Sequence, residues 1–242
     1  MILIADAHVN PAQGTHLPFF RMLEALGNTP EEIVFLGDVF DLWIALPRYE
    51  QAVHRRFLAW CRARKTDRKI GYIEGNHEFF LAEEKNDAFT WATSRAGRID
   101  GRGNLFCHGD RINRRDRNYL RFRRLTKNRL VKRLLRILPS GPFWAETIKK
   151  NLRHTNQGFR KALPREEILH FLRAAREAGI KRIFVGHFHQ EAFFRCGDTH
   201  LHILPDWITT RKITRFNPHT GQVTHAHWES LVRDCPCPPE IG

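Results

Sequence analysis

The stretch Ile33-Val34-Phe35-Leu36-Gly37-Asp38 decides the fold expected for this chain. Its four apolar residues predict a short buried strand, which ends at a glycine followed by a carboxylate. The same order recurs on both sides of it: residues 2–5 precede Asp6-Ala7-His8, and residues 70–73 precede Gly75-Asn76-His77-Glu78. Because α/β folds build their sites at the carboxyl ends of strands, this repetition predicts an α/β core with a polar site there.

Two more apolar runs later in the chain have the same form. Residues 105–107 lead into His108-Gly109-Asp110, and residues 183–185 lead into Gly186-His187-Phe188-His189. Amphipathic helical patterns cover about residues 17–26, 50–64 and 165–178, and they alternate with the strands as an α/β core requires. The later strand-like runs, 201–204, 213–216 and 223–228, have no helix between them, which favours antiparallel pairing near the C-terminal end.

The polar clusters carry side chains of the types that bind metal ions. Seven candidates are present: Asp6, His8, Asp38, Asn76, His108, His187 and His189. This set is large enough for two cations that share one carboxylate, for which Asp38 is the best candidate. We expect Asp6, His8, Asp38 and His189 around one ion, and Asp38, Asn76, His108 and His187 around the other. Two such ions indicate hydrolysis of a phosphate ester or anhydride.

Length and composition limit the class of protein. A chain of 242 residues with 42% hydrophobic and 27% charged residues fits one large soluble domain, residues 1–242. No apolar run approaches the roughly 18–20 residues that span a membrane, and no signal peptide is evident, so we expect a cytoplasmic protein. The five cysteines are irregularly spaced, which does not favour a disulfide framework.

The positive charge is concentrated in one segment. The chain has a formal net charge of +14, and residues 111–136 hold twelve Lys or Arg and a single acid, Asp116. Apolar residues at helical spacing lie between them, so we predict a helical insertion over residues 111–160 that folds over the site as a lid. The segment has three interpretations: a solvated helix face, a nucleic-acid groove, or a surface that docks on anionic phospholipid. The interleaving of basic and apolar residues favours the phospholipid surface.

At this point the motifs resemble a known family. The order Asp-x-His, Gly-Asp-x-x-Asp, Gly-Asn-His-Glu, His-Gly-Asp and Gly-His-x-His is that of the calcineurin-like metallophosphoesterases, and it extends from Asp6 to His189. The resemblance implies a four-layer α/β/β/α sandwich and a dinuclear site, often of manganese. Iron and zinc also suit such ligands.

A narrower resemblance concerns the substrate. Gly37-Asp38-Val39-Phe40-Asp41-Leu42-Trp43 is similar to a segment of the UDP-2,3-diacylglucosamine pyrophosphatases of lipid A biosynthesis, and Asp116, Tyr119, Phe122 and Arg123 match residues that follow His-Gly-Asp in those enzymes. In that family a helical lid holds the acyl chains. The chain differs at His77, where the best-known members have arginine. The resemblance implies substrate contacts from Asn76, His77, Asp116, Tyr119, Arg123 and His187.

The expected reaction is an in-line displacement at phosphorus. Asp38 would hold both ions, and His77 would stabilise or protonate the leaving group, since an imidazole titrates in the useful range. Alternatively, His77 only forms a hydrogen bond to Asp38 or Asp41. Asp41 is expected to be structural, and Glu78 to orient its neighbours.

Three functions follow from these residues. The leading one is cleavage of UDP-2,3-diacylglucosamine to UMP and 2,3-diacylglucosamine 1-phosphate at the cytoplasmic face of the inner membrane, to which the enzyme would bind peripherally. The second is hydrolysis of another phosphodiester, nucleotide or nucleic acid. The third is nucleic-acid binding with structural metals, which the ligand set disfavours because a structural site normally closes with four ligands.

Overall fold

Two β-sheets form the centre of the molecule. A computed structural model describes residues 1–137 and 163–233. The first sheet contains, in order, β13 (Val223–His227), β12 (Lys212–Phe216), β1 (Ile2–Ile4), β2 (Ile33–Phe35), β4 (Ile70–Ile73) and β6 (Trp91–Thr93). The second contains β10 (Ala192–Cys196), β11 (Thr199–Ile203), β9 (Arg182–Val185), β8 (Asn104–Cys107) and β7 (Arg98–Ile99). A small additional sheet pairs β3 (Trp43–Ile44) with β5 (Glu78–Phe79).

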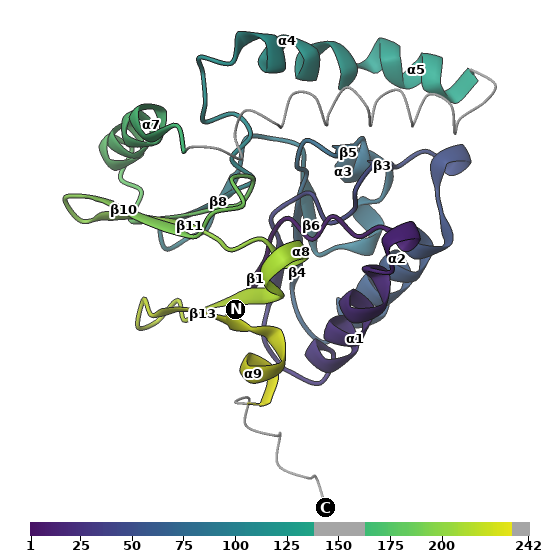
Figure 1. Cartoon of the computed structure of the whole chain (residues 1–242), viewed down its shortest axis with the longest axis horizontal. Helices are drawn as coiled ribbons and strands as arrows, with labels where there is room; N and C mark the ends of the chain where they lie inside the picture. The colour runs from purple at the N-terminus through teal and green to yellow at the C-terminus, as the bar shows by residue number, and fades with distance from the viewer. Residues whose placement is uncertain (138–162, 234–242) are drawn as a thin grey trace, which may run out of the picture.

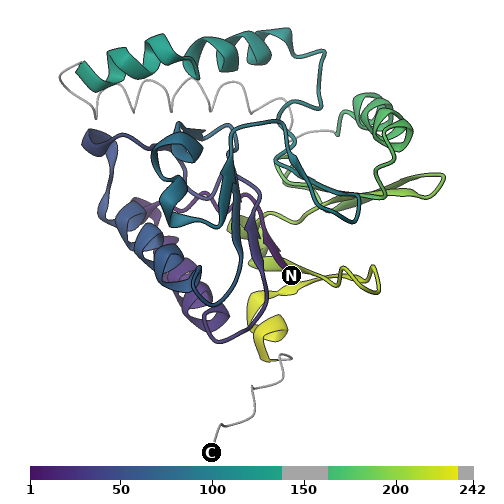
Figure 2. The same cartoon turned by 180° about the vertical axis from the view of Figure 1, so that it is seen from behind.

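Helices cover the outer faces of the two sheets (Figure 1, Figure 2). Helices α1 (His16–Leu26) and α2 (Ala52–Arg64) pack on the first sheet, and α7 (Arg165–Glu177) packs on the second. The apolar residues of α1 recur at the spacing of one helix face, which explains why this segment is an amphipathic helix. They are Phe19, Met22, Leu23 and Leu26. The short helices are α3 (Leu81–Glu84), α8 (Trp207–Thr210) and α9 (Trp228–Arg233).

Three separate layers of apolar contact define four layers of secondary structure. In β1, Ile2 and Ile4 face α1 and α2, whereas Leu3 faces the second sheet, as the period of a strand requires. Between the sheets, Leu3 belongs to the same cluster as Phe106 and Phe184. A third cluster joins α7 to the outer face of the second sheet. The expected α/β/β/α sandwich is therefore confirmed.

The predicted helices and strands lie within a few residues of their expected bounds, but five strands were missed: the short β3, β5 and β7, and two longer strands. The longer two are β6 and β10, and β10 changes the pairing of its neighbours. The pair β12–β13 is antiparallel as expected, whereas β11 is parallel to β9. Strand β11 is antiparallel to β10, but on its other side it is parallel to β9, which was not expected; β10 reverses the chain first, so that β11 returns in the direction of β9.

The segment expected to form a lid begins with two helices. Helices α4 (Arg117–Thr126) and α5 (Arg129–Ile137), together called the α4–α5 arm, extend across one end of the sandwich (Figure 1). Residues 138–160 of the expected lid lie outside the described residues. Both the lid and the single domain over residues 1–242 therefore stay predictions. Among the helices that the structure describes, none is long and apolar enough to cross a membrane.

Candidate metal centre

The seven candidate ligands lie in loops at one end of the two sheets. Each loop follows a strand of parallel pairing: β1, β2 and β4 in the first sheet, and β8 and β9 in the second. Because parallel strands deliver their carboxyl ends to the same edge, residues 181 positions apart in sequence become neighbours. The side chains that meet there are Asp6, His8, Asp38, Asn76, His108, His187 and His189, of which the first five are buried.

Five of these seven residues have a backbone conformation that side chains other than glycine rarely adopt. The φ angles are 51° for Asp6, 40° for His8, 53° for Asp38, 70° for His187 and 51° for His189. Such left-handed conformations cost roughly 1 kcal/mol each and persist where the surrounding structure enforces them. Asp6 and His8 are two positions apart, a spacing that places both side chains on the same face of an extended chain, and both reach the site.

One group of ligand atoms comes from the loops after β1 and β9. A nitrogen or oxygen from each of Asp6, His8 and His189 lies within 4.8 Å of the other two. The Nε2 atoms of His8 and His189 are 3.3 Å apart, and His189 Nε2 is 3.8 Å from Asp6 Oδ1. That carboxylate oxygen is buried and accepts no hydrogen bond from the described residues, as expected of an oxygen that binds a cation.

A second group is centred on Asp38, His108 and His187, which also offer three atoms within 4.8 Å of one another. Asn76 Oδ1 lies 2.9 Å from His108 Nε2 and 3.0 Å from His187 Nδ1. His108 Nδ1 donates a 2.7 Å hydrogen bond to the carbonyl of Leu36, which leaves Nε2 to face the site.

Asp38 connects the two groups. Its Oδ2 atom is 3.4 Å from His108 Nε2 and 3.8 Å from His8 Nε2. The structure thus brings together the two predicted ligand sets with the predicted shared carboxylate between them. A donor set of carboxylate, amide and imidazole groups fits divalent manganese, iron or zinc.

Burial and mutual charge shift the pKa values of these groups in opposite directions. Burial raises the pKa of Asp6 to about 6. Burial also acts to raise the pKa of Asp38, but the imidazoles of His108 and His77 outweigh it and hold that pKa well below its usual range. The charge of Asp38 in turn overcomes burial at His108 and raises its pKa to about 10, whereas burial and His108 lower the pKa of His187 to about 3. A cation bound between these groups would take the place of the shared protons.

Glu78 holds two of the ligand loops together. Its buried carboxylate accepts hydrogen bonds of 2.8 Å from the backbone N–H groups of Asp38, Val39 and Gly75, and one of 3.0 Å from the Tyr72 hydroxyl. Burial and the charge of Asp38 raise the pKa of Glu78 to about 7, while the backbone donors favour its ionised form. The structure thus gives Glu78 the orienting role expected from the sequence.

His77 lies beside both groups. Its backbone N–H donates to Asp38 Oδ1 at 2.8 Å, and its Nδ1 donates to the backbone carbonyl of Asp41 at 2.5 Å. Its Nε2 is 3.8 Å from Asp38 Oδ2, and its ring meets the ring of His8 edge-on. Asp41 itself accepts a hydrogen bond from the Asn10 side chain, in keeping with a structural role. The Nε2 atom of His77 therefore faces the candidate ligands. A catalytic role for His77 stays a prediction.

The three candidate substrate residues of the α4–α5 arm have partners within the protein. The Asp116 carboxylate caps α4 by accepting from the N–H of Tyr119 at 2.9 Å. The Tyr119 hydroxyl and Arg123 Nε both donate to Asp110 Oδ2, at 2.6 and 2.5 Å. These contacts tie α4 to the loop that carries His108, and contact of Asp116, Tyr119 and Arg123 with substrate stays a prediction.

Two residues at the site were missed by sequence reasoning. Lys127 donates a hydrogen bond to the carbonyl of Gly75, which lies 52 positions earlier in the sequence. The residue as a whole is half-buried, but its ammonium group is buried, and this burial lowers the pKa of Lys127 to about 8. Asp206 lies 3.8 Å from His189 Nδ1 and caps α8. Neither residue lies in a motif, so no local sequence signal identifies them.

One known protein family matches most of this chain. The family model described as calcineurin-like phosphoesterase matches residues 1–191. A UDP-2,3-diacylglucosamine hydrolase of Ralstonia nicotianae is 27% identical over 66% of this chain, which spans only 61% of that relative. A protein of the same name from Pseudomonas syringae is 24% identical over 86% of this chain and 88% of its own length. A solved archaeal phosphodiesterase has a TM-score of 0.48 at 12% identity, covering 93% of this chain and 97% of that one.

Proposed function

Because the chain belongs to the calcineurin-like phosphoesterase family, whose members are metal-dependent hydrolases, we propose that it cleaves the pyrophosphate bond of UDP-2,3-diacylglucosamine. The products would be UMP and 2,3-diacylglucosamine 1-phosphate, an intermediate of lipid A biosynthesis. One observation carries the proposal: two groups of metal-type ligands share Asp38 beneath a basic, amphipathic arm. The relatives that bear this substrate's name support it.

The proposed site residues divide the chemistry among them. Two divalent cations, manganese in this proposal, would activate water and neutralise charge on the phosphoryl oxygens. Asp6, His8 and His189 would hold one cation, and Asn76, His108 and His187 the other, with Asp38 between them. A neutral amide at Asn76 limits the negative charge that faces an anionic substrate.

His77 is the proposed proton donor. Its Nδ1 is fixed by the carbonyl of Asp41, so the ring presents Nε2 towards Asp38 and the ligand groups. A proton held at Nε2 would pass to the leaving phosphate oxygen as the bond to phosphorus breaks. Together with Asn76 and His187, His77 is also a proposed substrate contact. Arginine in this place would bind phosphate through a fixed charge, whereas His77 can give up its proton.

The α4–α5 arm is the proposed membrane-facing part. Four of its large apolar side chains are exposed: Leu125 at 66%, Leu130 at 69%, Leu134 at 56% and Ile137 at 76%. Exposed arginines lie among them. Apolar residues that enter the interface, together with basic residues that meet anionic headgroups, are the features of a peripheral membrane contact. We assign this contact to the cytoplasmic face of the inner membrane, where it would give access to a lipid-linked nucleotide.

The substrate assignment is tested by comparing three compounds. Manganese-loaded protein is incubated with UDP-2,3-diacylglucosamine, bis-p-nitrophenyl phosphate and single-stranded DNA, and product release is followed for each. UMP release that is lost in Asp38→Ala supports the proposal. Turnover of the diester or the DNA without UMP release would reject the lipid assignment and favour another phosphodiester substrate. Equal activity of Asp38→Ala and the natural protein would reject the proposed centre.

The membrane contact is tested by co-sedimentation with anionic phospholipid vesicles. The double substitution Leu130→Glu/Leu134→Glu places charge on adjacent turns of the exposed apolar face of α5, and we expect it to reduce binding at least tenfold. Leu17→Glu is the matched control, since Leu17 is 60% exposed on α1. Equal binding of the α5 variant and the control would show that the arm does not dock on the membrane.

A further inference from the structure

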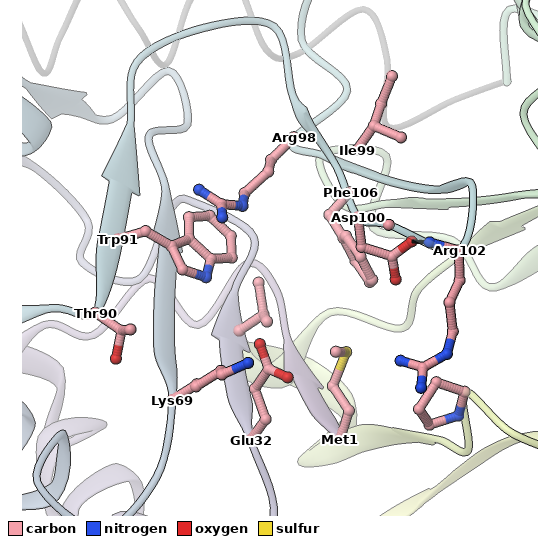
Figure 3. A pocket seen from close by; sticks show the side chains of 13 residues that line it. Met1, Glu32, Lys69, Thr90, Trp91, Arg98, Ile99, Asp100, Arg102 and Phe106 are labelled. Carbon is pink, nitrogen blue, oxygen red and sulfur yellow. Dashed lines mark hydrogen bonds between the residues drawn. The ribbon is translucent and has the colours of Figure 1, made fainter.

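A cavity of about 510 Å³ opens between the two sheets (Figure 3). Glu32, Lys69 and Thr90 line it, and each immediately precedes a strand of the first sheet: β2, β4 and β6 respectively. These strands are parallel, and their carboxyl ends lead towards the metal-type ligands. The cavity therefore lies at the amino-end edge of the sandwich and is separate from the proposed reaction.

The inner wall of the cavity is apolar. Val34 and Phe106 belong to the buried layer between the sheets, and the half-buried indole of Trp91 stands beside them. The indole packs against the backbone of β4 at Gly71, where an added Cβ atom would lie 2.1 Å from a ring carbon. Glycine at that position is what lets the tryptophan form this wall. A flat apolar wall of this kind suits the face of a planar ring.

The rim of the cavity is positively charged. Lys69, Arg98 and Arg102 line it, and no ion pair of theirs is formed within residues 1–137 and 163–233. The guanidinium of Arg98 lies 4.4 Å from the centre of the Trp91 ring. Asp100 is also in the lining, but its carboxylate already accepts hydrogen bonds from the backbone N–H groups of residues 102 and 104 and from the Asn104 amide.

Glu32 is the remaining acid in the lining. It lies near Lys69 but forms no ion pair with any residue that the structure describes, and burial raises its pKa. Among the described residues that line the cavity, the three cationic side chains outnumber the acids available to pair with them. This excess of positive charge favours an anionic ligand. A volume of about 510 Å³ is within the range of small-molecule sites, and a few polar groups around an apolar wall are typical of them.

We propose that this cavity binds a small organic anion that carries a flat ring, the chemistry of a nucleoside monophosphate. The ring packs against Trp91 and Phe106, and the anionic group is held by Arg98, Arg102 and Lys69. Glu32 accepts a hydrogen bond from a ligand hydroxyl. Such a ligand does not compete with the substrate for the metal-type ligands, and the proposal does not depend on the identity of that substrate.

The test is calorimetric titration of the whole chain with uridine monophosphate in the presence of a chelator. We expect saturable binding to the natural protein and equally to Asp38→Asn, and at least tenfold weaker binding to Arg98→Gln/Arg102→Gln. Arg21→Gln/Arg173→Gln is the matched control, because it removes the same charge from exposed positions on α1 and α7. If the double variant does not fold, the single substitution Lys69→Gln replaces it. Lys69 is exposed, and we expect its loss to weaken binding.

Four results would overturn the proposal. One is the absence of saturation at ligand concentrations up to about 1 mM, where even a weak small-molecule site is half-filled. Another is equal affinity of the Arg98→Gln/Arg102→Gln variant and its control. The third is equally tight binding of inorganic phosphate, because the ring would then contribute nothing. Loss of binding in Asp38→Asn alone would place the nucleotide at the metal centre and reject the cavity.

Discussion

Replacing Glu78 by glutamine tests whether one buried carboxylate holds the ligand loops in place. Oε2 accepts from the N–H groups of Asp38 and Gly75, and Oε1 accepts from the N–H of Val39 and from the Tyr72 hydroxyl. An amide keeps one of these oxygens and puts an NH2 group in place of the other. If the NH2 group replaces Oε1, the tyrosine can rotate its hydroxyl to accept, but the N–H of Val39 is left facing a donor.

The expected cost follows from these contacts. One buried donor without an acceptor costs about 1–3 kcal/mol, and the two remaining bonds lose the extra strength that a charged acceptor gives, at about 1 kcal/mol each. These losses come to about 4 kcal/mol. At about pH 8.5, however, the neutral variant also escapes the cost of keeping a buried carboxylate ionised, which is about 3 kcal/mol for a pKa raised from 4.5 to about 7. The free energy of unfolding should therefore fall by only about 1 kcal/mol. Glu78→Gln should also weaken the binding of divalent metal ions, since Asp38 and Asn76 are carried by the loosened loops.

The assay is urea denaturation at about pH 8.5, where Glu78 is ionised. Two controls separate the contributions. Tyr72→Phe removes one donor and should cost about 1 kcal/mol, and Glu83→Gln changes an exposed acid and should cost less than about 0.5 kcal/mol. A loss of about 4 kcal/mol or more for Glu78→Gln would refute the reasoning, because the ionised carboxylate would then carry no burial cost. So would unchanged metal affinity in Glu78→Gln, because the loop bonds would then contribute nothing to the position of the ligands.

Three further predictions concern other parts of the chain. Burial lowers the pKa of His54 to about 3, so the unfolded state binds the proton first as the pH falls below 6.5, and stability falls with it. His54→Gln should remove about 3 kcal/mol of this acid sensitivity between about pH 6.5 and 4.5, measured by denaturation at each pH. Arg123→Met should speed hydrogen exchange in α4 about a hundredfold because it leaves the buried Asp110 carboxylate without its cation, whereas the exposed Arg124→Met should not. Gly75→Ala would place a Cβ atom 2.2 Å from Asp38 Oδ1, so manganese affinity, measured by calorimetry, should fall at least tenfold; unchanged affinity would contradict the close approach of these loops.

The sequence was informative where local pattern and tertiary role coincide. Apolar runs that end in Asp, Asn or His located the carboxyl ends of β1, β2, β4, β8 and β9, because those strands are buried on both faces and the site is built from the residues that follow them. Edge strands such as β10 were missed. They are half-exposed, so their pairing is set by a neighbouring strand and not by a continuous apolar run.

The contacts that position the α4–α5 arm could not be read from the sequence. Lys127 reaches the carbonyl of Gly75, and Tyr49 donates from its hydroxyl to the carbonyl of Leu135 across 86 positions. Both acceptors are backbone carbonyl groups, and the residue type does not indicate which backbone carbonyl will accept a hydrogen bond. Tyr119 and Arg123 could be matched to a family pattern, but only the fold shows that both donate to the side-chain carboxylate of Asp110.

The left-handed backbone at the candidate ligands has a consequence for laboratory evolution. Asp6, His8, Asp38, His187 and His189 each occupy a conformation that glycine adopts without penalty. Variants of this chain selected only for resistance to heat should therefore accumulate glycine at these five positions and lose their hydrolytic activity. A screen that also requires turnover should keep all five unchanged, so the difference between the two outcomes would map the centre without any structure.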